Sequence, residues 1–270
     1  MNFTVLGAKG FIGSNLAAEL RRQGYRVQTP ERDADLTGES LGHVFYCIGL
    51  TADFRDRPLD TIEAHVCKLA QVLYHADYES FLYLSSTRLY GKSAKSGEDT
   101  ALHCRSDDPG DLYNISKMMG EAACFSIPKE TVRVARLSNV FGPGMSPLFL
   151  DLIIREALER REILLNTTLE SSKDYISARD VVSLLPMLAI SGKQRIYNVA
   201  SGVNTSNGQI IDMLKALTGC AVRISPSAER ISFPPVSTQR IREEFGFQPR
   251  VVLAEMKDIV HYYRELRNEV

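Results

Sequence analysis

The sequence predicts an α/β fold, with a doubly wound parallel sheet followed by a smaller C-terminal α/β lobe. Short apolar runs of β type alternate with amphipathic helices, a glycine-rich turn joins the first strand to the first helix, and the pattern changes near residue 141. Strands that alternate with helices are typical of a parallel sheet covered on both faces. The 270 residues, 44% of them hydrophobic, suffice for one core or for one domain with a smaller lobe.

The first residues predict a β-α-β unit of about 30 residues. Residues 3–6 form a short apolar run that predicts a strand, and residues 25–29 are predicted as a second strand. The segment between them, residues 12–22, predicts a helix because its apolar side chains recur at helical spacing. These side chains are Ile12, Leu16 and Leu20.

The alternation continues to residue 137. We expect strands at residues 43–48, 81–85 and 131–137, and helices at residues 59–75 and 113–125. The helix at 59–75 should bury the apolar residues that recur at helical spacing, namely Ile62, Val66, Leu69 and Leu73. These segments supply the remaining strands of the sheet and the helices that cover it.

After Gly142-Pro143-Gly144 the chain is expected to build the smaller lobe. Residues 225–235 are rich in Pro and Ser and predict a loop. The first helix of this part should bury Leu152, Ile153, Ala157 and Leu158. Helices are predicted at residues 149–160, 180–190, 209–218 and 254–267, and strands at residues 195–199 and 222–224.

Composition excludes several classes of function. The net charge of -1 offers no basic surplus, so we expect no nucleic-acid partner. No signal peptide is recognised before the first strand, and the longest apolar run, residues 184–190, is too short to span a membrane. The cysteines are odd in number and lack a Cys-x-x-Cys pair, which predicts neither a metal site nor a disulfide framework and fits the cytoplasm. They are Cys47, Cys67, Cys104, Cys124 and Cys220.

The turn Gly7-Ala8-Lys9-Gly10-Phe11-Ile12-Gly13 lies between the first strand and the first helix, and it predicts a dinucleotide site. Gly7 permits a sharp turn, Gly10 lets the backbone approach a pyrophosphate, and Gly13 lets the helix pack close to the sheet. The phosphates would lie at the helix N-terminus, where N–H groups are free. We expect all seven residues except Ala8 to contact the cofactor.

Because of this turn, we predict that residues 1–140 form a dinucleotide-binding domain of Rossmann type. Residues from about 175 to 202 are expected to return to this domain. The remaining segments, residues 141–174 and 203–270, would form the smaller lobe.

Residues near the end of the second strand leave the choice of cofactor open. Glu31 follows the turn by about 20 residues, where a carboxylate can bind the ribose diol of NAD. Arg32 beside it and Lys9 in the turn are cations that could bind the 2′-phosphate of NADP. We expect NAD, with NADP as the alternative.

A second set of residues predicts proton transfer. Tyr113 and Lys117 are four residues apart on one helix and therefore share a face. A nearby ammonium is expected to lower the pKa of the tyrosine, which can then exchange a proton with a hydroxyl or carbonyl group during hydride transfer. Ser86 and Thr87 follow a strand at the carboxyl edge of the sheet, where a hydroxyl can bind the reacting oxygen.

Several motifs, in this order, resemble the nucleotide-sugar-modifying branch of the NAD-dependent epimerase/dehydratase family, which belongs to the extended short-chain dehydrogenases/reductases. The resemblance covers nearly the whole chain. After the glycine turn, its motifs are Leu84-Ser-Ser-Thr-Arg-Leu-Tyr-Gly91, Tyr113-Asn-Ile-Ser-Lys117, Arg136-Leu-Ser-Asn-Val-Phe-Gly-Pro143, Asp174-Tyr-Ile176 with Asp180-Val181, Tyr197-Asn-Val-Ala-Ser-Gly202 and Arg240-Ile-Arg-Glu-Glu-Phe-Gly-Phe-Gln-Pro249.

The resemblance implies a role for individual residues. Tyr113 would be the acid/base and would also contact the cofactor, Lys117 would assist it and bind the nicotinamide ribose, and Ser86 would be the catalytic hydroxyl. Asn139 would contact the diphosphate of a nucleotide-sugar, and the smaller lobe would bind the substrate. Two further segments would border the cofactor: the pair Asp35-Leu36 at the adenine, and Cys47-Ile48-Gly49 at a strand end.

The sequence also departs from the family pattern. Thr87-Arg88 stands where 4,6-dehydratases have the Asp-Glu pair that removes water, which argues against that reaction. His65 replaces the usual Asn, either as a packing variant or as a site residue. The segment before Asp35 is compressed and is expected to lack a helix that epimerases have, which resembles the smaller nucleotide-sugar 4-ketoreductases. Residues 164–173 lack the usual Gly-rich turn.

The resemblance implies an oxidoreductase or epimerase that transfers hydride at a carbon of a nucleoside-diphosphate sugar, with C4 expected. Retained NAD(H) would give epimerisation, and exchanged cofactor would give reduction. The alternatives are an NADPH-dependent reductase of a non-sugar carbonyl and a non-catalytic NAD(P) sensor. In this family the helices at 59–75 and 113–125 often pair across a two-fold axis, so a homodimer is expected.

Overall fold

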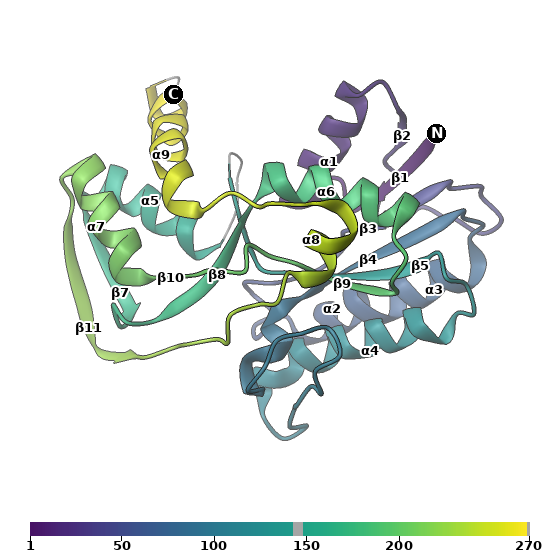
Figure 1. The fold of residues 1–270 in the computed structure, drawn as a ribbon, viewed down its shortest axis with the longest axis horizontal. Helices are drawn as coiled ribbons and strands as arrows, with labels where there is room; N and C mark the ends of the chain where they lie inside the picture. Colours follow the sequence, from purple (N-terminus) through teal and green to yellow (C-terminus); the bar gives the residue numbers. More distant parts are fainter. Residues whose placement is uncertain (143–147, 269–270) are drawn as a thin grey trace.

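The computed structural model describes residues 1–142 and 148–268, which form two lobes (Figure 1). Within these residues the larger lobe contains a six-stranded parallel sheet with the order β2-β1-β3-β4-β5-β9. Its strands are β1 (Asn2–Leu6), β2 (Arg26–Gln28), β3 (His43–Tyr46), β4 (Ser80–Ser86), β5 (Val132–Leu137) and β9 (Ile196–Val199). The predicted α/β fold with a parallel sheet is confirmed.

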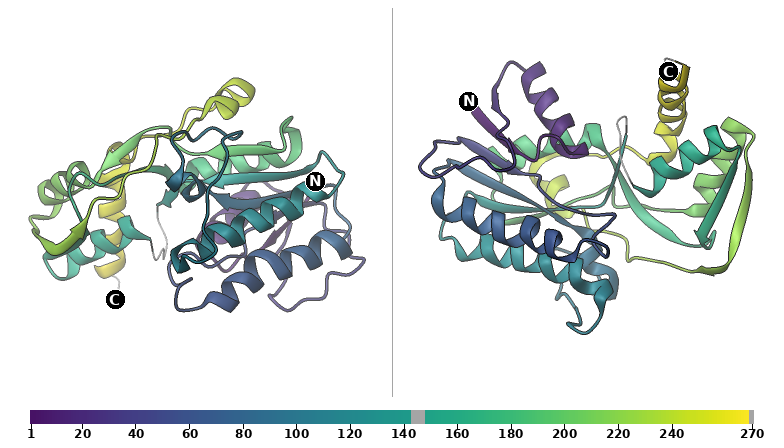
Figure 2. Two further views of the ribbon diagram at one scale, coloured as in Figure 1. Left: turned by 90° about the horizontal axis from the view of Figure 1, so that it is seen from below. Right: turned by 180° about the vertical axis from the view of Figure 1, so that it is seen from behind.

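Helices cover both faces of this sheet (Figure 2). Helices α1 (Phe11–Arg22) and α6 (Ala178–Ser191) pack on one face, and α4 (Leu112–Ser126) packs on the other with the helical segment at residues 58–75. Successive side chains of a strand point to opposite faces. Phe45 therefore joins the core under α1 and α6, whereas Val44 and Tyr46 join the core under α4.

The order of the strands locates the edge where a ligand would bind. Strand β2 lies on one side of β1 and β3 lies on the other, so the sheet grows in opposite directions from β1. In such sheets ligands bind beyond the carboxyl ends of the strands at this point. Residues 29–42 between β2 and β3 form turns and an isolated bridge, which confirms that a helix is missing there.

The predicted helix at residues 59–75 exists, but part of its expected buried face is wrong. It consists of α2 (Pro58–Ile62), a π-helical turn (Glu63–Cys67) and α3 (Lys68–His75). Leu69 and Leu73 are buried as expected, whereas Ala64 and His65 are buried in place of Ile62 and Val66. A π turn accommodates an extra residue in the helix, and this rotates the side chains that precede α3.

The smaller lobe has a core of its own. Helix α5 (Phe149–Glu159) buries Ile153, Ala157 and Leu158 there, but Leu152 is 46% exposed, so its expected burial is wrong. Leu150 and Ile154 are buried instead, because they continue the same helix face. The other elements of this lobe are β7 (Glu162–Thr167), α7 (Asn207–Thr218), β11 (Ala221–Glu229) and α9 (Val252–Asn268).

Several short elements were not predicted. Strands β6 (Asn139–Phe141), β8 (Ser172–Ser177) and β10 (Asn204–Ser206) form a three-stranded sheet that connects the lobes, and α8 (Gln239–Phe245) packs on β9. β11 extends into the segment predicted as a loop. Pro143 and Gly144 of the expected boundary lie outside the described residues. We retain as a proposal the division at residue 140, with residues from about 175 to 202 returning to the larger lobe.

Among the described residues, no helix combines the length and the apolar character that crossing a membrane requires. All five cysteines lie in the described ranges and are free thiols.

Candidate functional site

Two cavities meet at the carboxyl edge of the sheet. The first, of about 690 Å³, lies over the turn after β1 and the end of β2. The second, of about 500 Å³, lies between the two lobes, next to Tyr113. Cys47, Ile48 and Gly49 line both cavities, so an elongated ligand could pass along the end of β3 from one to the other.

The glycine turn borders the first cavity with the geometry that a dinucleotide needs. Gly7 has a φ of +86°, and a Cβ at this position would lie 2.9 Å from the carbonyl carbon of Cys47. A Cβ on Gly13 would lie 2.3 Å from the carbonyl oxygen of Gly7, so α1 can approach the sheet only with glycine there. A Cβ on Gly10 would meet just that oxygen, at 3.4 Å, and no side chain caps α1. This turn therefore fits a pyrophosphate.

The structure brings most of the predicted cofactor residues to these cavities. Gly7, Lys9, Gly10, Glu31, Arg32 and Leu36 line the first cavity together with Cys47, Ile48 and Gly49. Ile12 lines the second cavity. Phe11 packs against the core, and Gly13 lies at the start of α1. Asp35 borders a neighbouring hollow beside α3, where its carboxylate accepts a hydrogen bond from the Thr37 N–H.

Two of the three charged residues that left the choice of cofactor open form an ion pair with each other. Lys9 Nζ donates to Glu31 Oε2 at 2.6 Å, and both side chains are exposed. An exposed ion pair contributes little to stability. The pairing nevertheless partly neutralises Lys9, which weakens it as a binding site for a 2′-phosphate.

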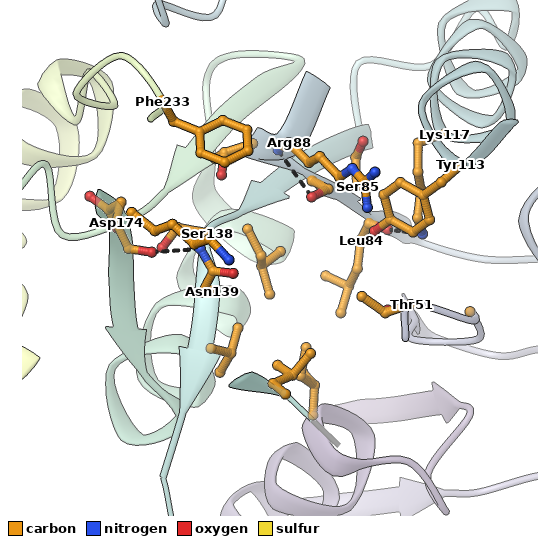
Figure 3. A pocket seen from close by; sticks show the side chains of 18 of the residues that line it. Thr51, Leu84, Ser85, Arg88, Tyr113, Lys117, Ser138, Asn139, Asp174 and Phe233 are labelled. Carbon is orange, nitrogen blue, oxygen red and sulfur yellow. Dashed lines mark hydrogen bonds between the residues drawn. The ribbon is translucent and has the colours of Figure 1, made fainter. Parts of the chain in front are cut away.

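Tyr113, Ser86 and Lys117 line the second cavity, as Figure 3 shows for Tyr113 and Lys117. Hydrogen bonds from Ser86 and Thr51 lower the pKa of Tyr113, but burial of the phenol has the larger effect and raises the pKa above its usual value of 10.0. The prediction of a lowered pKa is therefore wrong for the protein without ligands, because desolvation disfavours the phenolate.

Lys117 is held against the sheet behind this phenol. Its Nζ donates to the carbonyl oxygen of Leu84 at 2.8 Å, and burial lowers its pKa to about 7. The cation that lowers the pKa of Tyr113 is Arg88, whose Cζ lies 5.4 Å from the centre of the tyrosine ring. The sequence singled out Arg88 only as a departure from the dehydratase pattern.

His65 lies behind the second cavity, where hydrogen bonds connect it to Leu50, to Ser116 and, through Ser116, to the backbone of Tyr113. Its Nε2 accepts a hydrogen bond from the Leu50 N–H at 3.1 Å, so the proton lies on Nδ1, which donates to Ser116 Oγ at 2.8 Å. Ser116 donates in turn to the carbonyl oxygen of Tyr113 at 2.9 Å. Burial, followed by the charge of Lys117, lowers the pKa of His65 to about 2, so its ring stays neutral. It does not line the cavity, which favours the packing interpretation.

The opposite wall of the second cavity comes from the sheet between the lobes (Figure 3). Asn139 donates to the carbonyl oxygen of Asp174 at 2.9 Å, and both residues line the cavity. The Asp174 carboxylate accepts hydrogen bonds from the N–H groups of Ser201 and Gly202. Thr87 also lines this cavity.

The segment at residues 164–173, which lacks the Gly-rich turn, forms much of β7 and the start of β8. It contributes Lys173 to the second cavity. Sequence reasoning missed this lysine, Thr51, Arg55 and Phe233 as lining residues. Thr51 directly follows the predicted strand end, and Lys173 precedes a quoted motif, so position alone could have indicated both.

The buried Lys117 predicts a stability that changes with pH. The folded protein has a pKa of about 7 at this residue, against an ordinary value of 10.5, so the unfolded chain binds more protons between these values. The free energy of unfolding should therefore rise with pH across this window. Lys117→Met removes the penalty, so we expect the variant to be more stable than the wild type near pH 7, by a margin that shrinks toward pH 10.5.

Urea unfolding of both proteins at several pH values measures this margin. The comparison cancels the groups that the two proteins share. A difference in the free energy of unfolding that is constant with pH would show that Lys117 is not held in a site that disfavours its charge.

Comparisons with known proteins agree with this arrangement. Residues 3–200 match the model described as "NAD dependent epimerase/dehydratase family". UDP-glucuronic acid decarboxylase 1 of Xenopus tropicalis is 24% identical, over 97% of this chain and 72% of its own. The dTDP-glucose 4,6-dehydratase of Streptomyces griseus is also 24% identical, over 70% of this chain and 60% of its own.

A solved structure, MoeE5 in complex with UDP-glucuronic acid and NAD, superimposes with a TM-score of 0.85. It is 22% identical and the match covers 98% of this chain and 100% of that one. At this identity the likeness concerns the fold. Because a 4,6-dehydratase is among the relatives, similarity gives no support to the exclusion of that reaction made from Thr87-Arg88.

Proposed function

The chain belongs to the NAD-dependent epimerase/dehydratase family, and we propose that it transfers hydride between NAD and C4 of a nucleoside-diphosphate sugar, as an epimerase or a 4-ketoreductase. The observation that carries this proposal is the position of the Tyr113 phenol. It lies in the second cavity with the hydroxyl groups of Ser86 and Thr51, close to Cys47, Ile48 and Gly49, where the two cavities meet.

The residues of the second cavity can divide the chemistry between them. The cofactor, when bound, accepts or returns the hydride of the carbinol carbon. Tyr113 takes the hydroxyl proton as the C–H bond breaks, and it returns a proton when a keto group is reduced. Ser86 hydrogen-bonds the same substrate oxygen and orients it. Lys117 lies one helical turn from Tyr113, where we propose that it binds the ribose next to the nicotinamide.

Arg88 supports a redox reaction without elimination of water. Elimination from C5 and C6 needs an acid and a base near Tyr113, and Arg88 occupies that place with a cation. Among the described residues that line the second cavity, Asp174 is the one carboxylate, and it already accepts hydrogen bonds from Ser201 and Gly202.

We propose NAD as the cofactor because Glu31 can bind the ribose diol once a ligand displaces Lys9 from it. The sequence leaves open whether the cofactor is retained or exchanged. We also propose a homodimer that pairs through the outer faces of α2, α3 and α4, where Leu59 and Met119 are 78% and 54% exposed. The free thiols suit the cytoplasm as the proposed location.

Native mass spectrometry of the purified protein tests these proposals together. We expect a mass of two chains that bind NAD in preference to NADP, and NAD that is already bound on purification and released on denaturation would indicate the epimerase. A protein purified without cofactor that oxidises NADPH when a 4-keto nucleotide-sugar is added would indicate the reductase with the alternative cofactor. A monomeric mass would contradict the dimer, and the absence of binding or turnover with either cofactor would contradict the proposed function.

A further inference from the structure

The second cavity is rich in basic side chains. The described residues that line it include two lysines, both with a pKa lowered by burial, and two arginines, and Asp174 is their single acidic neighbour in the lining. Lys117 is held at the sheet by the carbonyl oxygen of Leu84, and Lys173 lies over the ring of Phe149 beside Asn139, at the opposite wall. The other two basic residues of the lining, Arg55 and Arg88, both contact the ring of Phe54.

Arg88 is held at the reacting end of this cavity. It belongs to the 3-10 turn that begins at Thr87, and its N–H donates to Ser86 Oγ at 3.2 Å. Its guanidinium lies 4.9 Å from the centre of Phe54 and 5.4 Å from the centre of Tyr113, and the centres of the two rings are themselves 5.5 Å apart, so the three groups contact one another. Cation–π contacts of this kind hold the guanidinium in place and leave its N–H groups available for hydrogen bonds.

No carboxylate of the described chain forms an ion pair with Arg88. Its guanidinium makes one long hydrogen bond, of 3.4 Å, to the carbonyl oxygen of Gly110. The acidic residue whose charge acts on it, Asp111, is already bound by Lys92 and by the Arg105 N–H. Burial lowers the pKa of Arg88, so the protein bears a cost for holding this charge beside Tyr113.

We propose that Arg88 binds a carboxylate on the sugar, so that the substrate is a nucleoside-diphosphate hexuronic acid. If the oxygen at C4 lies against Tyr113 and Ser86, the substituent on the adjacent C5 is one carbon away, within reach of the guanidinium beside the same ring. A hexuronic acid has its carboxylate there, as C6. Arginine binds a carboxylate through two parallel hydrogen bonds, whereas the neutral hydroxymethyl group of a hexose offers no charge.

This inference rests on the proposed function, and a binding experiment can separate the two. The NAD-loaded protein is titrated calorimetrically with UDP-glucuronate and with UDP-glucose, and with the corresponding dTDP-sugars, so that the nucleotide does not decide the outcome. We expect the hexuronate to bind about ten- to a hundredfold more tightly than the hexose, which is the value of a hydrogen bond between charged groups.

Two variants locate the source of this preference. In Arg88→Gln the ratio of the two dissociation constants should fall to about one, with little change in the affinity for the hexose. Arg55→Gln removes an exposed cation from the lining of the same cavity and should keep most of the preference. Thermal unfolding of each variant confirms that it is folded.

The outcomes distinguish the two proposals. If no nucleotide-sugar binds to the NAD-loaded wild type, the proposed function itself fails. If both sugars bind the wild type equally, or if Arg88→Gln weakens both to the same extent, the nucleotide-sugar site stands and the assignment of Arg88 to a sugar carboxylate is wrong. Equal loss of preference in Arg55→Gln would also overturn it, because the effect would then come from the general charge of the cavity.

Discussion

Replacing Tyr113 by phenylalanine is expected to lower kcat for hydride transfer by about 10²–10⁴-fold, the usual contribution of a positioned acid or base. The change removes the hydroxyl group that exchanges a proton with the substrate. It keeps the ring that packs against Phe54, His65 and the guanidinium of Arg88. The affinity for NAD should therefore change little, since the residues of the first cavity are untouched.

Stopped-flow measurement of nicotinamide absorbance, with a nucleotide-sugar in excess, gives the rate of the hydride step directly. Tyr262→Phe, in α9 of the smaller lobe, is the matched control because it removes the same atom far from both cavities, and it should retain the wild-type rate. Retention of the rate in Tyr113→Phe would show that another group carries the proton.

The sequence predicts those parts of the site whose residues lie close together in the chain. The glycine turn could be predicted because Gly7, Gly10 and Gly13 each meet a demand of the same short turn. Tyr113 and Lys117 could be paired because four residues of a helix bring two side chains to one face. Both sets follow from local geometry, and a single local element places each of them.

The rest depends on residues that are far apart in the chain. The ion pair between Lys9 and Glu31 and the stacking of Arg88 on Tyr113 arise only when separate elements meet. Strands β6 and β10 were not predicted because three residues are too few to show an alternation, and β8 was not predicted because its polar first half obscures one. The raised pKa of Tyr113 depends on how deeply the phenol is buried, and the spacing of two residues carries no information about burial.

A buried ion pair beneath the site should have the largest effect on stability. Arg136 of β5 donates two hydrogen bonds to the carboxylate of Glu121 in α4, at 2.9 and 2.6 Å, and both side chains are 5% exposed. Ser85 donates to the same carboxylate at 2.6 Å, and Arg136 donates to Tyr90 Oη at 2.7 Å. We expect Arg136→Leu to lower the free energy of unfolding by about 3–5 kcal/mol, because Glu121 is then buried without a counter-charge.

Urea unfolding measures this loss, and an exposed pair supplies the control. Arg223 pairs with Glu162 at 2.8 Å on the surface of the smaller lobe, so Arg223→Leu should cost no more than about 1 kcal/mol. Equal losses in the two variants would show that burial does not determine the value of the Arg136 pair.

The double variant Glu121→Leu with Arg136→Leu tests whether the ion pair serves the activity of the site or only the stability of the fold. Replacing both charges by apolar groups often costs little, so most of the stability lost in Arg136→Leu should return. Activity should not return with it. The charge of Glu121 raises the pKa of Lys117, and Glu121 also accepts the hydrogen bond of Ser85, next to Ser86. A double variant that is stable but slow would mean that the ion pair positions the site, whereas recovery of both properties would mean that it serves only the fold.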